Sequence, residues 1–188
     1  MHIAMVSAEC APIAKAGGLG DLVQGLAGEL ACMGEHVEVI LPAYDGLRLD
    51  ALDRPRPLGI EFQVPFRGVP IDCRILGLRL DGYECRLIAP RSAQRFFERG
   101  RIYGEADDAE RFAFFSRAVA DYVSRPESRP DVLHCNDWQT GLIPVLLAER
   151  QAAGERIPVC YSLHNVGYQG WVEPELLTAV GLDPARLL

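Results

Sequence analysis

The feature that most constrains the fold is an alternation of short apolar runs with longer amphipathic segments. Residues 2–8 form an apolar run typical of a buried strand, residues 21–33 show helical periodicity, and residues 36–42 form a second apolar run. Two strands separated by a helix of this length pair in parallel through a right-handed crossover. Gly34 is a natural stop for the helix. The apolar face predicted for this helix consists of Leu22, Val23, Leu26, Leu30 and Met33.

The middle of the chain departs from this alternation. Between residues 58 and 90, apolar runs are separated by Gly68-Val69-Pro70 and by Asp81-Gly82, a dipeptide that favours tight hairpins. We expect a β-meander whose last strand, residues 84–89, rejoins the main sheet. Further along, the sequence predicts helices at 109–124, 138–153 and 174–180 and strands at 131–135 and 157–163. The predicted fold class is α/β, a Rossmann-like, doubly wound and mostly parallel sheet with a β-hairpin or meander insertion.

Composition narrows the possible partners. The 188 residues are 49% hydrophobic and 24% charged, as in ordinary globular proteins, and no apolar run is long enough to cross a bilayer. The net charge of −7 argues against nucleic acid and anionic membranes as partners. The six cysteines lack a CxxC pair and zinc-like spacing, so we expect no metal and reduced thiols that pack as small apolar groups. Because the N-terminus also lacks a signal-peptide pattern, we expect a cytoplasmic protein.

The loop after the first strand is the first candidate site, because ligands of such sheets bind beyond the carboxyl ends of the strands. This loop holds three glycines and Lys15, the single lysine beside 18 arginines. Gly17 and Gly18 allow the backbone to approach a ligand, and the N-terminus of the next helix suits a phosphate or a sugar hydroxyl. Asp21 can cap that helix or accept a hydrogen bond from a hydroxyl. The glycine spacing does not match the dinucleotide fingerprint G-x-G-x-x-G.

Two later strands also end in polar residues. Asp137 follows the strand predicted at 131–135, where it can be a helix N-cap, a ligand of a hydroxyl group, or both. His164 follows the next strand in a glycine-punctuated loop, where its imidazole can donate to a sugar hydroxyl or carry a proton. His134 lies within its strand and is interpreted as structural.

Two weaker signals precede the helix at 109–124. Tyr103 is a candidate platform for a sugar ring, because aromatic side chains supply large contact areas. Four arginines at roughly helical spacing are interpreted as a solvated basic face: Arg91, Arg95, Arg99 and Arg101.

Four segments resemble, in family order, the motifs of bacterial glycogen synthases and plant starch synthases, which are glycosyltransferases of the two-domain GT-B architecture. KAGGLGD at 15–21 resembles the loop K-x-G-G-L-G/A-D, and IYGEADDAERFAFFSRA at 102–118 resembles the helix Y-x…RF-x-x-F-x-x-A. HCNDWQTG at 134–141 resembles H-x-[HN]-D-W, and SLHNVGYQG at 162–170 resembles T-[VI]-H-N-x-x-[YF]-Q-G. These matches span nearly the whole chain, so together they are highly specific.

The resemblance implies a reaction and a role for each matching residue. A glucosyl unit would pass from a nucleotide-glucose, ADP-glucose or UDP-glucose, to the non-reducing end of an α-1,4-glucan, with retained configuration and without metal or cofactor. The residues implied are the donor-binding Lys15, Gly17, Gly18 and Asp21, the catalytic Asp137 and His164, and the acceptor or supporting residues Asn165, Gln169 and Tyr103. Two positions depart from the motifs, since Ser162 stands where Thr is usual and Asn136 where many bacterial members have His.

The resemblance also implies that residues 1–188 are one truncated N-terminal domain, because no segment matches the family's C-terminal nucleotide-sugar-binding domain. That missing domain would be a partner of this chain, and the chain alone is expected to be nearly inactive. Two other functions stay open. One is a stand-alone glucan-binding module without catalysis. The other is a dinucleotide-binding oxidoreductase, which the imperfect glycine pattern and the missing acidic residue after the second strand disfavour.

Overall fold

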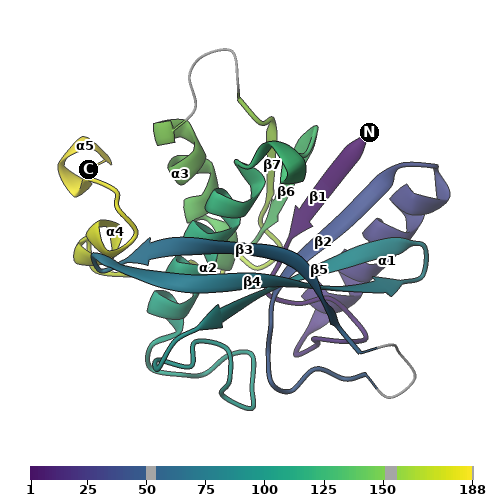
Figure 1. The fold of residues 1–188 in the computed structure, drawn as a ribbon, viewed down its shortest axis with the longest axis horizontal. Coiled ribbons are helices and arrows are strands. Elements are labelled where there is room, and N and C mark those ends of the chain that lie inside the picture. Colours follow the sequence, from purple (N-terminus) through teal and green to yellow (C-terminus); the bar gives the residue numbers. More distant parts are fainter. Residues whose placement is uncertain (50–53, 151–155, 188) are drawn as a thin grey trace.

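A single mostly parallel sheet organises the chain in the computed structural model, which describes residues 1–49, 54–150 and 156–187 (Figure 1). Its seven strands lie in the order β3-β4-β5-β2-β1-β6-β7. The five strands from β5 to β7 pair in parallel, whereas β3, β4 and β5 pair antiparallel. The bounds are β1 His2–Val6, β2 His36–Pro42, β3 Arg56–Phe66, β4 Val69–Leu80, β5 Tyr83–Arg91, β6 Val132–Asn136 and β7 Val159–Ser162.

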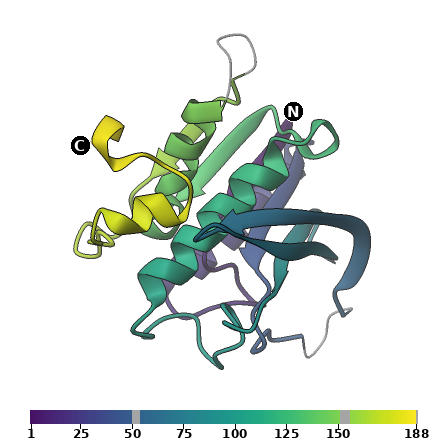
Figure 2. The same cartoon turned by 60° about the vertical axis from the view of Figure 1, so that its left-hand side comes forward.

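Helices cover both faces of this sheet. The chain moves from β1 to β2 in one direction and from β5 through β6 to β7 in the other. Right-handed crossovers therefore place α1 on one face and α2 and α3 on the opposite face, as Figures 1 and 2 show. The predicted doubly wound sheet is confirmed. The helices are α1 Gly18–Cys32, α2 Asp108–Val123, α3 Leu142–Arg150, α4 Glu175–Ala179 and α5 Pro184–Leu187.

The predicted meander is confirmed, and its last strand joins the main sheet by pairing in parallel with β2. Both of its turns use two residues with positive φ, as tight hairpins matching the twist of the strands require. The second turn is the predicted Asp81-Gly82. The first turn is Arg67-Gly68, with φ of 50° and 74°, one residue earlier than expected, because Val69 already belongs to β4.

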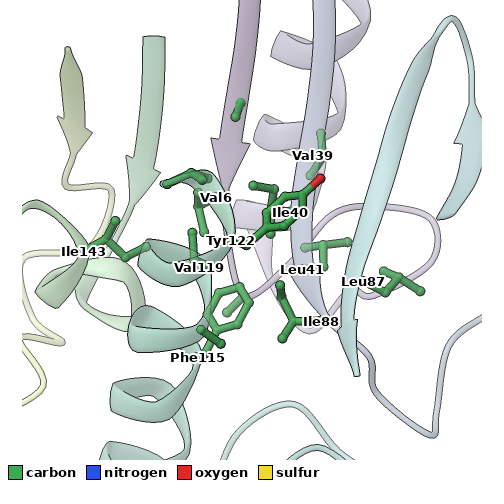
Figure 3. Close-up of a cluster of buried hydrophobic side chains, with 14 of the residues drawn as sticks. Val6, Val39, Ile40, Leu41, Leu87, Ile88, Phe115, Val119, Tyr122 and Ile143 are labelled. Carbon is green, nitrogen blue, oxygen red and sulfur yellow. The ribbon is translucent and has the colours of Figure 1, made fainter. Parts of the chain in front are cut away.

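The core lies between the sheet and α2, where side chains from both layers interdigitate (Figure 3). Phe115 and Val119 of α2 face Ile40 of β2 and Ile88 of β5, and all four are fully buried. Burial of side chains this size contributes about 1.5–3 kcal/mol each. Phe115 and Val119 therefore form part of the face that packs α2 on the sheet.

Helix α1 differs from the expectation in its start and in its buried face. It begins at Gly18, three residues early, so Asp21 lies within its first turn and does not cap it. Its buried residues are the small Gly20, Val23 and Ala27, while Leu22 and Met33 are 40% and 76% exposed. Small residues let the helix axis approach the loop after β1, since a Cβ on Gly20 would lie 3.4 Å from the Ala11 nitrogen.

Two further elements of the second half are shorter than predicted. The helix expected from Trp138 begins as a 3₁₀ turn, Trp138–Thr140, followed by α3, and its predicted end at residue 153 lies outside the described residues. The strand expected at 157–163 is reduced to β7. The predicted helix 174–180 is confirmed as α4, with Pro174 as its N-cap rather than its first residue.

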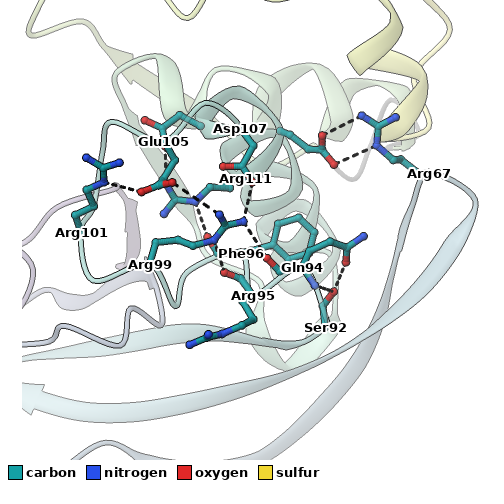
Figure 4. A network of polar contacts seen from close by, with 12 residues as sticks. Arg67, Ser92, Gln94, Arg95, Phe96, Arg99, Arg101, Glu105, Asp107 and Arg111 are labelled. Carbon is teal, nitrogen blue, oxygen red and sulfur yellow. Dashed lines mark hydrogen bonds and ion pairs between the residues drawn. The ribbon is translucent and has the colours of Figure 1, made fainter.

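The four arginines expected to form a helical basic face do not lie on a helix. Arg91 ends β5, and the other three lie in the loop shown in Figure 4. Residues 92–107 form turns, and Arg95 has a positive φ of 49°. Each arginine instead pairs with a carboxylate, at distances from 2.6 to 3.3 Å: Arg91 with Glu61, Arg95 with Glu98, Arg99 with Asp107 and Arg101 with Glu105. The helical spacing was therefore wrong; the side chains of Arg91, Arg95 and Arg101 are more than half exposed, as a solvated face requires, but each is paired with a carboxylate.

All six cysteines are free thiols, as predicted. Cys10, Cys73, Cys85 and Cys135 are buried, whereas Cys32 and Cys160 are exposed. The expectation that the thiols pack as small apolar groups was wrong for Cys32, which ends α1, and for Cys160, because β7 is an edge strand whose side chains are largely exposed. Among the described helices, none is long and apolar enough to cross a membrane.

Candidate functional site

The carboxyl ends of β1, β6 and β7 meet at one edge of the sheet. The chain leaves β1 toward the face covered by α1 and leaves β6 toward the opposite face, so a crevice opens between these two strand ends. A pocket of about 680 Å³ lies there. Residues from three strand-end loops and from the start of α2 line it, among them Glu9, Gly17, Gly18, Tyr103, Asp108, Asp137, Trp138, His164, Asn165 and Tyr168.

A buried carboxylate that sequence reasoning missed shapes the glycine-rich loop. Glu9 is 3% exposed, and its Oε2 accepts hydrogen bonds from the backbone amides of Ala16 and Gly17, both at 2.6 Å. The Tyr103 hydroxyl donates to the other oxygen of Glu9 at 2.9 Å. Two amides at the start of α1 are thus already satisfied by the protein. The available signal was an acidic residue directly after a buried strand, ahead of a glycine-rich loop.

Lys15 and Asp21 lie outside the pocket. Lys15 Nζ donates to Asp21 Oδ1 at 2.7 Å, and both side chains are more than a third exposed. Gly17 and Gly18, by contrast, line the pocket with their backbone. The structure therefore brings the two glycines to the site and holds the lysine in an ion pair at its margin.

Asp137 points toward the loop after β7 rather than capping its own turn. It occupies the N-cap position of the 3₁₀ turn, but its side chain makes no capping bond. Its Oδ1 accepts hydrogen bonds from the amides of His164 at 2.7 Å and Asn165 at 3.4 Å. The carboxylate thereby joins the ends of β6 and β7 at the pocket wall.

The ring of His164 is oriented by Asn136, at the end of β6. The amide nitrogen of Asn136 donates to two backbone carbonyls, of Val6 and His134, so its oxygen is the atom 2.9 Å from His164 Nε2. Nε2 therefore carries the proton, and in the neutral ring Nδ1 is the free acceptor. Asn136 was noted only as a departure from a motif, yet it fixes the tautomer of the candidate histidine.

His134 lies next to these residues. Its Nε2 is 2.8 Å from the Ser162 hydroxyl. Burial lowers the pKa of His134, and the nearby His164 lowers it further. His134 therefore favours its neutral form beside the pocket, in keeping with a structural role.

Tyr103 and Trp138 form the aromatic part of the site. The Tyr103 ring packs on Phe112 at 5.9 Å between centroids, and Trp138 contacts the same ring edge-on at 5.4 Å. Burial and the neighbouring Glu9 raise the pKa of Tyr103 well above its usual value, so its hydroxyl stays protonated and acts as a donor. Phe112 of α2 thus supports both rings, a contact that the sequence did not indicate.

The last two candidate residues differ in their position. Asn165 lines the pocket, and its side-chain oxygen accepts from the Gly167 amide at 3.1 Å. Gln169 does not line it; its amide donates to the Val166 carbonyl at 3.0 Å, and the residue lies in a neighbouring apolar pocket of about 530 Å³. Trp138, Asn165 and Tyr168 line both spaces.

The pocket carries acidic groups in a lining that is otherwise largely apolar. Glu9, Asp108 and Asp137 contribute carboxylates, and its described lining contains no lysine or arginine. Such a surface suits hydroxyl groups better than phosphates. Over residues 1–49, 54–150 and 156–187, no cluster of three or more His, Cys, Asp or Glu side chains could hold a metal ion.

A doubly wound sheet with a pocket at its switch point is the arrangement of one half of a GT-B glycosyltransferase, and structural comparison agrees. The chain belongs to the starch synthase catalytic domain family, whose model matches residues 2–187. The structure of the starch synthase IV catalytic domain from Arabidopsis thaliana, bound to ADP and acarbose, superposes over 99% of this chain and 38% of its own, with a TM-score of 0.92 and 36% identity.

Curated relatives support the same family. A glycogen synthase 1 from Nitrosococcus oceani is 45% identical over the whole chain, and one from a Synechococcus strain is 44% identical over 97% of it. A sucrose-phosphate synthase from Thermosynechococcus elongatus, at 18% identity and a TM-score of 0.53, shares only the fold. The chain spans 39% and 38% of the lengths of the two glycogen synthases.

Proposed function

We propose that this chain is the acceptor-side part of a glucosyltransferase of glycogen or starch synthesis. In this proposal, glucose passes from ADP-glucose, or UDP-glucose, to the non-reducing end of an α-1,4-glucan with retained configuration. Relatives named glycogen synthase and starch synthase support the reaction class. The observation that carries the proposal is the convergence of Asp137, His164 and the Gly17-Gly18 backbone on one pocket at the switch point of the sheet.

The geometry suggests how the two catalytic candidates act. His164 has Nδ1 free as an acceptor while Asn136 holds its Nε2 proton, so Nδ1 is suited to a hydroxyl of the transferred glucose. The Asp137 carboxylate beside it adds negative charge where an oxocarbenium-like centre would develop. The two residues thus favour positive charge on the sugar and bind its hydroxyls.

The diphosphate of the donor needs positive charge that this pocket lacks. Gly18 at the start of α1 offers backbone and helix-dipole stabilisation, but Glu9 already occupies the amides of Ala16 and Gly17. Lys15 would have to leave Asp21 to reach a phosphate. We therefore infer that most of the charge facing the diphosphate comes from a second domain, the partner that the family architecture implies. In this proposal the reaction uses no metal or cofactor, as the family resemblance implies.

A chimera tests the reaction. This chain would replace the matching 39% of the Nitrosococcus oceani relative, and incorporation of labelled glucose from ADP-glucose into maltooligosaccharide would be measured. The chimera should transfer glucose, and Asp137→Asn or His164→Gln should reduce kcat by about 10²-fold or more. An exposed Glu29→Gln variant, on the solvent side of α1, serves as control. A chimera that folds but never transfers glucose would refute the proposal.

A stand-alone glucan-binding module remains the alternative, favoured by the aromatic wall of the pocket. It predicts that the chain alone binds maltotriose in calorimetry and that Tyr103→Ala weakens this binding. Failure to bind at millimolar maltotriose would remove it. The isolated chain should transfer little glucose from ADP-glucose; turnover at the rate of the chimera would contradict the idea that a second domain is needed.

A further inference from the structure

The backbone of Asp137 adopts a conformation that is rare for any residue with a side chain. Its φ is 57° and its ψ is 179°. Aspartate tolerates positive φ mainly near the left-handed helical region, where ψ is about +47°. The combination seen here belongs to a region occupied almost only by glycine, and such residues persist only where neighbours hold them. Asp137 therefore has to be held in place.

Hydrogen bonds to both sides of Asp137 supply this restraint. Its carbonyl oxygen accepts from the Tyr161 hydroxyl at 2.9 Å and from the Thr140 amide and hydroxyl at 3.1 and 3.0 Å. Its amide donates to the Ser162 carbonyl at 2.9 Å. Thr140 belongs to the same turn as Asp137, whereas Tyr161 reaches across from β7. The Tyr161 hydroxyl is thus a side-chain restraint that links Asp137 to the neighbouring strand.

Gly141 leaves room for this contact. A Cβ at position 141 would lie 3.2 Å from the Tyr161 hydroxyl and 3.2 Å from the Trp138 carbonyl. The backbone of Gly141 itself is helical, with φ of −64° and ψ of −24°, so no special dihedral requires glycine there. The missing side chain leaves room instead, and one of the two groups that border this room is the hydroxyl that holds Asp137.

We propose that Tyr161 is a positioning residue whose hydroxyl holds the Asp137 peptide in its strained conformation. In the ordinary conformation of an N-cap, the Asp137 side chain would turn back to its own 3₁₀ turn. In the held conformation it accepts from the His164 amide and faces the pocket. Only the identity of the ligand rests on the proposed function; the positioning itself is a property of the fold.

Thermal unfolding of the chain tests the strain. Asp137→Gly and Asp137→Ala both remove the carboxylate, but only glycine relieves the backbone, so the glycine variant should have the higher Tm. Glu29 is an exposed position inside α1 and serves as the control. There the alanine variant should have the higher Tm, because glycine destabilises a helix relative to alanine. Tyr161→Phe should lower Tm less in the Asp137→Gly background than in the parent chain. The proposal is wrong if Asp137→Ala has the higher Tm. It is also wrong if Tyr161→Phe lowers Tm equally in the Asp137→Gly background and in the parent chain.

Hydrogen exchange tests the positioning itself. Tyr161→Phe should speed exchange of the His164 amide by about fivefold or more, because its acceptor carboxylate is released. Gly141→Ala should have a smaller effect in the same direction while keeping the tyrosine, since its Cβ crowds the hydroxyl. Glu29→Gln, an exposed change in α1 outside the pocket, is the control. Unchanged exchange at His164 in both test variants would overturn the proposal.

Sugar binding by this chain and glucose transfer by the chimera distinguish the positioning of Asp137 by Tyr161 from the proposed function. If the parent chain binds maltotriose, Tyr161→Phe and Gly141→Ala should weaken binding in proportion to the faster exchange at His164. If the chimera folds but transfers no glucose while exchange and Tm of this chain respond as expected, the function proposal fails and the positioning stands. A parent chain that binds no maltotriose removes only the glucan-binding alternative. If binding is retained in both variants despite faster exchange, Tyr161 does not position Asp137 for the ligand.

Discussion

At the residue scale, the geometry of the site depends on side chains that fix a loop or orient a neighbouring ring, and sequence analysis did not select these side chains as functional. Glu9 occupies the amides of Ala16 and Gly17, and Asn136 fixes the proton of His164. Lys15, the single lysine, drew attention because it stands alone in the sequence, yet in the structure it pairs with Asp21 beside the pocket. That a residue type occurs once in a sequence does not show where its side chain lies, because a side chain as long as that of lysine can adopt many positions.

Removing the Glu9 carboxylate should loosen the glycine-rich loop. Glu9→Ala leaves two backbone amides and the Tyr103 hydroxyl without their acceptor, so we expect a loss of about 2–3 kcal/mol in the free energy of unfolding. Urea unfolding measures this loss. Glu98→Ala, which removes an exposed carboxylate paired with Arg95, should cost less than about 1 kcal/mol. Equal losses in the two variants would show that Glu9 does not hold the loop.

Gly170 should be intolerant of any side chain. Its φ is +63°, and an added Cβ would lie 2.3 Å from Trp138 Cε3, so Gly170→Ala must displace the indole ring. We expect a loss of about 1–3 kcal/mol and a shift of tryptophan fluorescence. Gly25→Ala in α1 meets no atom within 4 Å and should gain up to about 1 kcal/mol. A neutral Gly170→Ala variant would mean that the loop does not pack on Trp138.

At the scale of elements, the site is formed where three strands end together. The parallel registers of β1 with β6 and of β6 with β7 bring Glu9, Asp137 and His164 to the same edge. Periodicity predicted these strands, and the rule for parallel sheets predicted the edge. The early start of α1 and its small-residue face were missed, because close packing of a helix on a loop leaves no apolar stripe to detect.

The effect of His164, which follows β7, on His134 in β6 should be visible in the titration of His134. Its pKa is lowered by burial and by His164, so the folded chain prefers the neutral ring. That preference adds stability above the unfolded value of about 6.5, and the added stability is lost as pH falls through the lower folded pKa. NMR titration should place the pKa of His134 below 6.5, and His164→Gln should raise it. A value at or above 6.5 would contradict the burial described here.

At the scale of the whole molecule, the distribution of thiols separates its interior from its surface. Burial raises the pKa of Cys73 and of Cys135 to about 12, so neither forms a reactive thiolate near neutral pH. A thiol reagent should therefore modify Cys32 and Cys160 in the native chain and all six cysteines after unfolding. Mass spectrometry identifies the modified residues. Rapid native labelling of Cys85 or Cys135 would show that the central sheet opens.

The sequence by itself determined the class of sheet, the succession of strands and helices along the chain, the meander and the loops that carry the site. Those features follow from local periodicity and from turn residues, which act over a few positions. Only the tertiary structure decided which side chains meet: Glu9 with Tyr103, Asn136 with His164 and Tyr161 with Asp137. These pairs are 94, 28 and 24 residues apart in the chain. Their contacts depend on the sheet that brings distant segments together, and no local pattern records it.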